Sequence, residues 1–256
     1  RPRDLDRPRP VVLYIHGGGF RILSKDSHEG IALQFARRGY VVVNINYRLA
    51  PEHRFPAAIE DACRAYEWVV EHAETFGGDP SRIAIAGESA GANLATGVAV
   101  ASCYDWDRPW ARRLRALHHA PSAILPTCGM LQVTDAERFS RRKNLPWFVS
   151  DHLEQVERDY LPDAPPKPQA PSLAHPIPII DRTEPDRRLP PFYTCVGTKD
   201  PLLDDTRRLE RALRRHGTAC HATYAVGQPH AYHCAFWTNP ALRVWRETYA
   251  FLDRVF

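Results

Sequence analysis

Short, unbroken runs of apolar residues recur along the chain, separated by longer stretches in which apolar positions repeat with helical spacing. The runs that predict strands are residues 11–15, 40–47, 82–86, 122–127, 192–196 and 221–226, of which 122–127 is the least regular. Runs of this length without polar alternation are typical of strands covered on both faces, as in a parallel sheet. The pattern therefore indicates a mostly parallel sheet inside the protein.

The stretches between these runs are expected to form helices at residues 27–38, 57–74, 90–101, 203–216 and 240–254. Strand-then-helix alternation predicts an α/β sandwich of three layers with right-handed crossovers. A chain of 256 residues fits one large core better than two small ones. We therefore expect a single domain over residues 1–256.

Residues 104–190 interrupt this alternation and contain a run of prolines, namely Pro162, Pro165, Pro166, Pro168 and Pro171. Long segments of this kind inside compact domains are usually lids or flexible insertions. We expect an insertion at 135–175 that acts as a small cap, with its covering part at 135–160 and a proline-rich tether at about 162–178.

Composition and charge narrow the class of protein. Hydrophobic residues make up 44% and charged residues 25%, as in soluble globular proteins, and no run of 18 apolar residues predicts a membrane span. The net charge of +4 is spread along the chain, and the short arginine-rich stretch at 108–115 fits a solvated face better than a phosphate-binding patch. Nucleic acid is therefore not an expected partner.

The six cysteines are scattered and form no CxxC pair, so they predict neither a zinc site nor a redox motif. His118 and His119 likewise lack partners at the spacing of metal ligands. No signal peptide is visible in this chain, which begins with Arg1, and the cysteine pattern suits a reducing compartment. The expected location is the cytoplasm.

The first chemical motif is Gly87-Glu88-Ser89-Ala90-Gly91, a G-x-S-x-G sequence between the strand at 82–86 and the helix at 90–101. A serine on a sharp strand-to-helix turn is held in strained geometry and needs small residues two positions before and after it. The turn exposes the hydroxyl beside a helix N-terminus, which favours developing negative charge. We therefore predict that Ser89 is a nucleophile.

A serine nucleophile needs a base, and the base needs a carboxylate to orient it. On this type of sheet the chain order is serine, acid, histidine. Asp200 follows the strand at 192–196 and His230 follows the strand at 221–226. Asp204 and Asp205 are alternatives for the acid, although carboxylates at a helix start are ordinarily N-caps. His233 is the alternative for the base.

The first strand ends in a glycine-rich segment, His16-Gly17-Gly18-Gly19-Phe20. In lipases and esterases an HGGG loop at this point supplies backbone N–H groups to the oxyanion. We predict that Gly18 and Gly19 donate there with the N–H of Ala90, and that His16 secures the loop by hydrogen bonds. A phosphate-binding loop is disfavoured, because the chain has neither G-K-[ST] nor G-x-G-x-x-G.

Five ordered segments resemble the hormone-sensitive-lipase-like family of carboxylesterases within the α/β-hydrolase fold. They are HGGGF at 16–20, YRLAPEHRFPAAIED at 47–61, GDPSRIAIAGESAGANLA at 78–95, DPLLDD at 200–205 and PHAYH at 229–233. The resemblance runs from about residue 10 to the end of the chain and is least clear over 104–175. It implies a catalytic triad of Ser89, Asp200 and His230 and an oxyanion hole of Gly18, Gly19 and Ala90.

The resemblance also implies supporting roles around the site. Tyr47, Arg48 and Glu52 belong to a structural loop and are expected to brace the pocket. Glu88 stands where relatives often carry Asp or Thr, and is expected to support the triad through hydrogen bonds without being catalytic.

One departure from the family concerns the N-terminal side. Members carry several tens of residues before the HGGG strand, forming antiparallel edge strands and cap helices, whereas 15 residues precede His16 here. We expect either a trimmed chain or a cap reduced to the insertion. An exposed sheet edge would follow, and with it a tendency to form a homodimer.

The expected function is hydrolysis of short- to medium-chain carboxylic esters through an acyl-enzyme. The mechanism needs no metal or organic cofactor, and the only expected substrate partner is a small-molecule ester. Alternatives are a small-amide hydrolase or formamidase using the same triad, and a non-catalytic small-molecule receptor on the same scaffold. Trp147, Phe148 and Met130 are candidates for the wall of an acyl pocket, although aromatic residues in an insertion more often pack within a lid.

Overall fold

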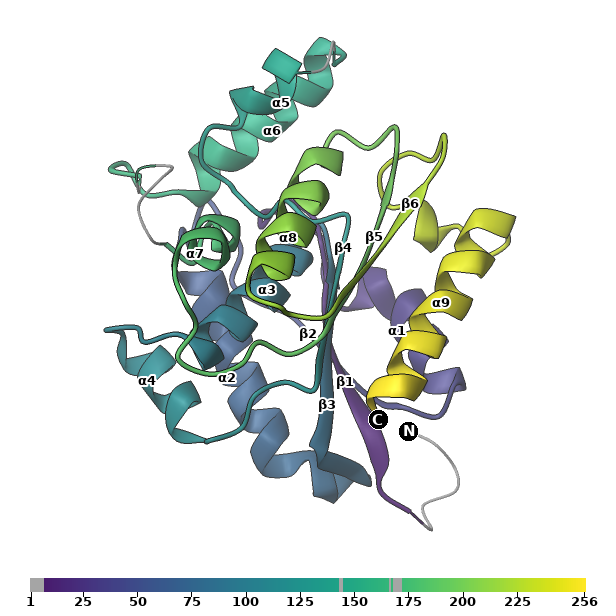
Figure 1. The fold of residues 1–256 in the computed structure, drawn as a ribbon. Coiled ribbons are helices and arrows are strands. Elements are labelled where there is room, and N and C mark those ends of the chain that lie inside the picture. Colours follow the sequence, from purple (N-terminus) through teal and green to yellow (C-terminus); the bar gives the residue numbers. More distant parts are fainter. Residues whose placement is uncertain (1–6, 143–144, 166, 168–171) are drawn as a thin grey trace.

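A computed structural model describes residues 7–142, 145–165, 167 and 172–256. Its centre is a parallel six-stranded sheet in the order β2-β1-β3-β4-β5-β6 (Figure 1). The strands are β1 (Arg9–Ile15), β2 (Val41–Ile45), β3 (Gly78–Glu88), β4 (Ala123–Thr127), β5 (Phe192–Gly197) and β6 (Cys220–Ala225). The predicted parallel sheet is confirmed, and the predicted runs fall on these strands.

Two layers of helices cover the sheet, with α1 and α9 on one face and α2, α3, α4, α7 and α8 on the other (Figure 1). The helices are α1 (Glu29–Arg37), α2 (Ala57–His72), α3 (Ala90–Cys103), α4 (Pro109–Ala116), α5 (Glu137–Arg142), α6 (Trp147–Tyr160), α7 (Pro176–Arg182), α8 (Leu203–Arg215) and α9 (Asn239–Val255). Each of the five predicted helices is present, so the three-layer sandwich is confirmed.

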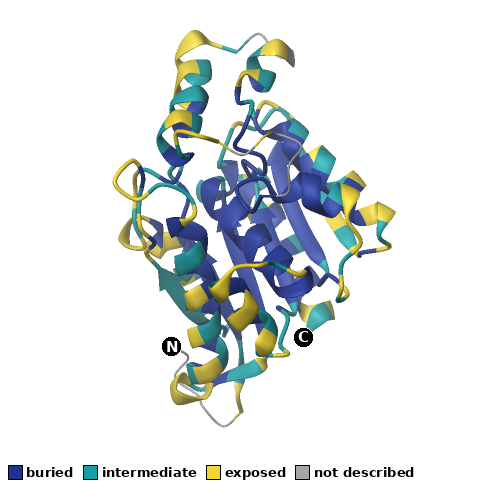
Figure 2. Ribbon diagram, turned by 90° about the vertical axis from the view of Figure 1, so that its left-hand side faces the viewer, coloured by how far each residue is buried: buried dark blue, intermediate teal, exposed yellow. Residues whose placement is uncertain are grey.

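The central strands carry runs of mostly apolar residues because both faces of the sheet are buried. Along β1, Val11 and Leu13 pack into the core beneath α2 and α3, whereas Val12 and Tyr14 pack into the core beneath α1 and α9. Figure 2 shows the sheet as buried beneath a more exposed outer surface. Burial on both faces explains why the runs carry no alternation of polar residues.

The arginine-rich stretch at 108–115 forms the amphipathic helix α4. Ala111 and Leu114 are buried, while Arg112 and Arg113 are exposed and pair with Asp107 and Glu67. This agrees with the prediction of a solvated face.

The predicted proline-rich tether is too long at its C-terminal end. Pro166, Pro168 and Pro171 lie outside the described residues, but Pro176 and Pro178 belong to α7, whose residues 176–180 are buried. Proline is compatible with the first turn of a helix, because backbone N–H groups there make no hydrogen bond within the helix. The last two prolines of the expected tether, Pro176 and Pro178, therefore lie in the first turn of a core helix.

Helices α5 and α6 extend beyond the body of the molecule at the carboxyl end of the sheet (Figure 1). Among the described residues, no helix is both long and apolar enough to cross a membrane.

Candidate active site

Ser89 lies at the sharp turn between β3 and α3. Its backbone has φ 54° and ψ −115°, in a region that side chains other than glycine rarely adopt. Its N–H donates to the carbonyl of Thr127 at the end of β4, at 3.0 Å. The strained conformation is held by the sheet below it and by α3, all of whose residues are buried.

Two glycines permit this turn because the end of β1 lies against it. A Cβ on Gly87 would approach the backbone of Gly91 to 2.5 Å, and a Cβ on Gly91 would overlap the carbonyl oxygen of Ile15. No L side chain fits either position without a shift of the main chain. The G-x-S-x-G spacing thus has a steric cause in the close approach of three backbone segments.

Gly91→Ala is therefore expected to lower the free energy of unfolding by roughly 1–3 kcal/mol or more, since backbone cannot move aside as a side chain can. Gly97→Ala in the same helix is the matched control, because the one close contact of its added Cβ is with the flexible Cδ1 of Ile59, at 2.8 Å, and the nearest backbone atom outside the helix is at 3.8 Å. Urea unfolding of both variants measures the difference. Equal stability of the two would contradict this account of the turn.

Asp200 and His230 come together from the ends of β5 and β6. The Nδ1 atom of His230 lies 2.8 Å from Oδ2 of Asp200, whose side chain is fully buried. The other carboxylate oxygen accepts the N–H of Leu202 at 2.8 Å. Burial lowers the pKa of His230, but the hydrogen bond and charge of Asp200, with the charge of Glu88, outweigh it and leave the pKa raised.

Ser89 and His230 open onto one cavity of about 400 Å³. Its other walls are mostly apolar and come from α6, the loop after β1, the segment after β4 and the loops around Asp200 and His230. They are Gly19, Met130, Phe148, Val149, His152, Leu153, Val156, Lys199, Pro201, Leu202 and Pro229. Of the three residues predicted to line an acyl pocket, Met130 and Phe148 line this cavity. Trp147 is 79% exposed and is not among the lining residues.

The glycine loop after β1 lies beside this cavity. Gly18 has φ 103° and Gly19 has φ 60°, and both values belong to the left-handed region that favours glycine. A Cβ on Gly19 would come within 2.7 Å of Cγ2 of Val156 in α6. The backbone of this loop can therefore approach the cavity and α6 only because Gly18 and Gly19 have no side chains.

Hydrogen bonds from two rings fix this loop. Nδ1 of His16 bonds the carbonyl of Gly17 at 2.7 Å, and the Tyr47 hydroxyl donates to the carbonyl of His16 at 3.0 Å. The two rings stack at 4.3 Å between centroids. His16 thus binds the loop backbone, and Tyr47 braces it.

The comparisons with known proteins agree with this geometry. The model of a family described as having the alpha/beta hydrolase fold matches residues 12–234. The chain belongs to the hormone-sensitive-lipase-like carboxylesterase family. Esterase LipI of Mycobacterium tuberculosis is 37% identical over 238 residues, which cover 87% of this chain and 65% of that protein. The chain therefore spans slightly less than two thirds of this relative.

Solved structures of esterases have the same architecture. An esterase of Pyrobaculum calidifontis superposes with a TM-score of 0.83 at 28% identity, covering 99% of this chain and 78% of that one. A structure titled "Bacterial Heroin Esterase" gives a TM-score of 0.82 at 29% identity, covering 99% and 77% respectively.

Within this family member, the alternative triad residues lie elsewhere. His233 is buried, and burial lowers its pKa to about 4. Asp204 pairs with Arg207 at 3.4 Å. The expectation that Asp204 or Asp205 is the N-cap of α8 is wrong, because the N-cap position is Leu202. The carboxylate of Asp205 lies instead against the segment after β4. There it accepts hydrogen bonds from the backbone N–H groups of Leu131 and Gln132 and from Arg138.

Glu88 lies beneath the serine turn in a buried network. It accepts hydrogen bonds from the Tyr14 hydroxyl and from Nε2 of His28, each at 3.1 Å. Burial raises the pKa of Glu88, but the hydrogen bond and charge of His28 outweigh it, so the pKa is lowered. Sequence reasoning missed His28, because a single histidine near a helix start carries no motif.

The YRLAPE segment braces the site only in part. Arg48 pairs with Asp61 at 2.9 Å and so fixes the segment to α2. Glu52 is exposed and makes no hydrogen bond or ion pair with the side chains of the described residues. Its predicted bracing role is not supported by a contact.

Two groups of described residues bring three possible metal-binding atoms within 4.8 Å of one another. One is Glu88, His233 and Cys234, and burial raises the pKa of that thiol to about 12. The other consists of Cys128 with Asp200 and His230, and burial also raises the pKa of the Cys128 thiol. Protonated thiols are poor metal ligands, so neither group favours a metal.

Proposed function

We propose that the protein is a serine carboxylesterase that hydrolyses short- to medium-chain esters. The observation that carries this proposal is that Ser89 and the Asp200-bound His230 face one apolar cavity. The names of the relatives support it, since they are esterases and carboxylic ester hydrolases. The retained His230 and these names favour an ester hydrolase over a receptor or an amidase.

In the proposed reaction, Oγ of Ser89 attacks the ester carbonyl while Nε2 of His230 takes its proton. Asp200 holds the ring through Nδ1 and stabilises the imidazolium. The tetrahedral intermediate collapses as His230 protonates the departing alcohol, leaving an acyl group on Ser89. Water then attacks the acyl-enzyme, again with His230 as base, and releases the carboxylic acid.

The oxyanion is proposed to be bound by the N–H groups of Gly18, Gly19 and Ala90. Ala90 begins α3, where backbone N–H groups lack partners within the helix. Such donors are each worth roughly 2.7–4 kcal/mol to the transition state. The glycine loop and the serine turn fix the positions of these N–H groups before substrate binds.

The cap belongs to the same proposal, as part of one domain over 1–256 with an insertion at 135–175. The carboxyl end of α6 is fixed to the glycine loop, because Tyr160 stacks on Phe20 at 3.8 Å and Asp159 pairs with Arg21 at 2.7 Å. Its first half supplies Phe148 and Val149 to the cavity.

The test of the proposed esterase function is turnover of p-nitrophenyl acetate and butanoate by the purified chain. Failure to hydrolyse any ester would reject the proposal.

The pH dependence follows from His230, which must be neutral to accept the proton. Because Asp200 raises the pKa of His230, kcat/KM is expected to fall toward acid with an apparent pKa above the ordinary 6.5. Measuring kcat/KM for a neutral ester from pH 5 to 9 gives this value. An acid limb centred well below 6.5 would contradict the pairing.

Location and assembly are further parts of the proposal. All six cysteines are free thiols, which supports the cytoplasm. Among the described strands, β2 and β6 each pair on one side, which supports a homodimer formed along a sheet edge. Light scattering during size-exclusion chromatography measures the mass in solution. The mass of two chains is expected, and the mass of one chain would contradict the dimer.

A further inference from the structure

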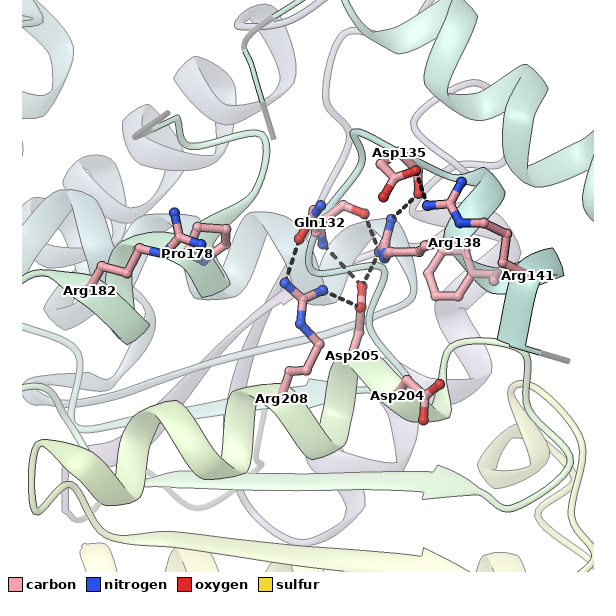
Figure 3. Close-up of a pocket in the computed structure, with 10 residues that line it drawn as sticks. Gln132, Asp135, Arg138, Arg141, Pro178, Arg182, Asp204, Asp205 and Arg208 are labelled. Atoms are coloured by element: carbon pink, nitrogen blue, oxygen red, sulfur yellow. Dashed lines mark hydrogen bonds and ion pairs between the residues drawn. The ribbon is translucent and has the colours of Figure 1, made fainter. Parts of the chain in front are cut away.

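Asp205 is a fully buried carboxylate in the first turn of α8 that the proposed mechanism does not use. Its Oδ2 atom accepts the backbone N–H groups of Leu131 at 3.0 Å and Gln132 at 3.1 Å. The same oxygen pairs with Arg138 at 2.8 Å, and Oδ1 pairs with Arg208 at 3.1 Å (Figure 3). A buried charge is tolerated only with such partners, so these four donors define one position for the carboxylate.

The segment held by Asp205 is a wall of the candidate active site. Met130 lines the cavity of Ser89, its N–H donates to the carbonyl of Ser89 at 3.2 Å, and its own carbonyl accepts from Asn93 at 2.8 Å. The next two N–H groups along the chain are those that Asp205 binds. One end of this short segment is thus fixed by the serine turn, and the other by α8.

Arg138 and Arg208 complete the attachment. Arg138 donates to the carbonyls of Gln132 at 2.6 Å and Thr134 at 3.0 Å, and Arg208 donates to Oε1 of Gln132 at 2.5 Å. Arg138 belongs to α5, so the network joins the cap, the wall segment and α8. The helix α8 also follows the loop of Asp200, five residues before Asp205 along the chain.

A second cavity, of about 370 Å³, lies behind this wall. It is polar, and Gln132, Arg138, Asp205 and Arg208 are among its lining residues (Figure 3). Met130 lines the apolar cavity while Gln132, two residues later, lines the polar one. The segment from 130 to 132 therefore lies between two open spaces. Its hydrogen bonds hold it there, together with the packing of Met130 and Leu131 in the core.

We propose that Asp205 is a positioning residue that sets the length of acyl chain accepted beside Ser89, by holding the 130–132 wall against the apolar cavity. This inference rests on the proposed esterase function. Asp205 touches no reacting atom, and its effect passes through Met130. Without the carboxylate, the wall yields toward the polar cavity and longer acyl chains fit.

The test compares Asp205→Asn with Asp204→Asn on p-nitrophenyl esters from acetate to decanoate. The amide has no charge and only one acceptor oxygen for the four donors, and its N–H₂ group must face either the wall or Arg208. The anchor of the wall is therefore weakened, and the ratio of kcat/KM for decanoate to butanoate is expected to rise about fivefold or more. Asp204 pairs with Arg207 in its own helix, so its variant should keep the wild-type ratio. An unchanged ratio in folded Asp205→Asn would overturn the inference, even if its Tm falls.

Hydrogen exchange separates this inference from the esterase proposal. The amides of Leu131 and Gln132 should exchange at least about tenfold faster in Asp205→Asn than in Asp204→Asn. If exchange is faster in Asp205→Asn but the wild-type chain hydrolyses no ester, the proposed esterase function is rejected while the anchoring of the wall by Asp205 is supported. Unchanged exchange would overturn the anchoring. If Asp205→Asn does not fold, Arg208→Gln removes one partly exposed partner and should shift the ester ratio in the same direction.

Discussion

Ser89→Ala is expected to reduce kcat for p-nitrophenyl butanoate by about 10⁴-fold or more, leaving only what the oxyanion donors and substrate binding provide. Alanine removes the attacking oxygen but fits the turn between β3 and α3. The fold should therefore be unchanged, and circular dichroism would verify this. The loss would be in kcat rather than in KM, because the cavity walls remain.

Ser102→Ala is the matched control for this variant. Ser102 lies in α3, the helix that follows Ser89, but it is buried and does not line the cavity, and its hydroxyl donates to the carbonyl of Val98 at 2.8 Å. Its variant should keep wild-type kcat. An active Ser89→Ala protein would remove the nucleophile from the proposed mechanism.

Asp200→Asn should lower kcat by about 10⁴-fold, as in other triads where the acid is replaced by its amide. The asparagine side chain can present its N–H₂ to Nδ1, which selects the tautomer whose Nε2 already carries a proton and cannot accept one from Ser89. The geometry should persist, because Asn fills nearly the same buried volume. Fluorophosphonate labelling of Ser89 should slow in parallel with kcat.

Asp204→Asn tests whether the acid has been assigned to the right carboxylate. Its side chain pairs with Arg207 on the surface of α8, four residues beyond Asp200 along the chain. We expect activity close to that of the wild type. The assignment would fail if Asp204→Asn lost activity while Asp200→Asn kept it.

The sheet could be predicted because strands buried on both faces require runs of consecutive apolar residues, which are visible in the sequence. The run 11–15 is apolar at every position, and the run 192–196 is interrupted only by Thr194, whereas a helix at the surface carries polar residues on its outer face. Helix α7 could not be predicted in the same way. It is short, and its prolines at 176 and 178 are typical of a tether unless the helix start is known.

The candidate triad could be predicted because each member follows a strand in a fixed chain order. Asp200 and His230 are 30 residues apart, yet β5 and β6 are neighbours and bring them within 2.8 Å. The supporting residues have no such signal. His28 and Asp205 act through contacts with residues 60 and more than 70 positions away, which only the folded chain brings together.

The most direct test of the central claim is the site of covalent labelling by a fluorophosphonate, located by mass spectrometry of the digested protein. The account predicts one adduct per chain, on the peptide that contains Ser89, and its absence from Ser89→Ala under the same conditions. Labelling of another residue, or no labelling of a folded wild-type chain, would contradict the claim that Ser89 is the activated nucleophile.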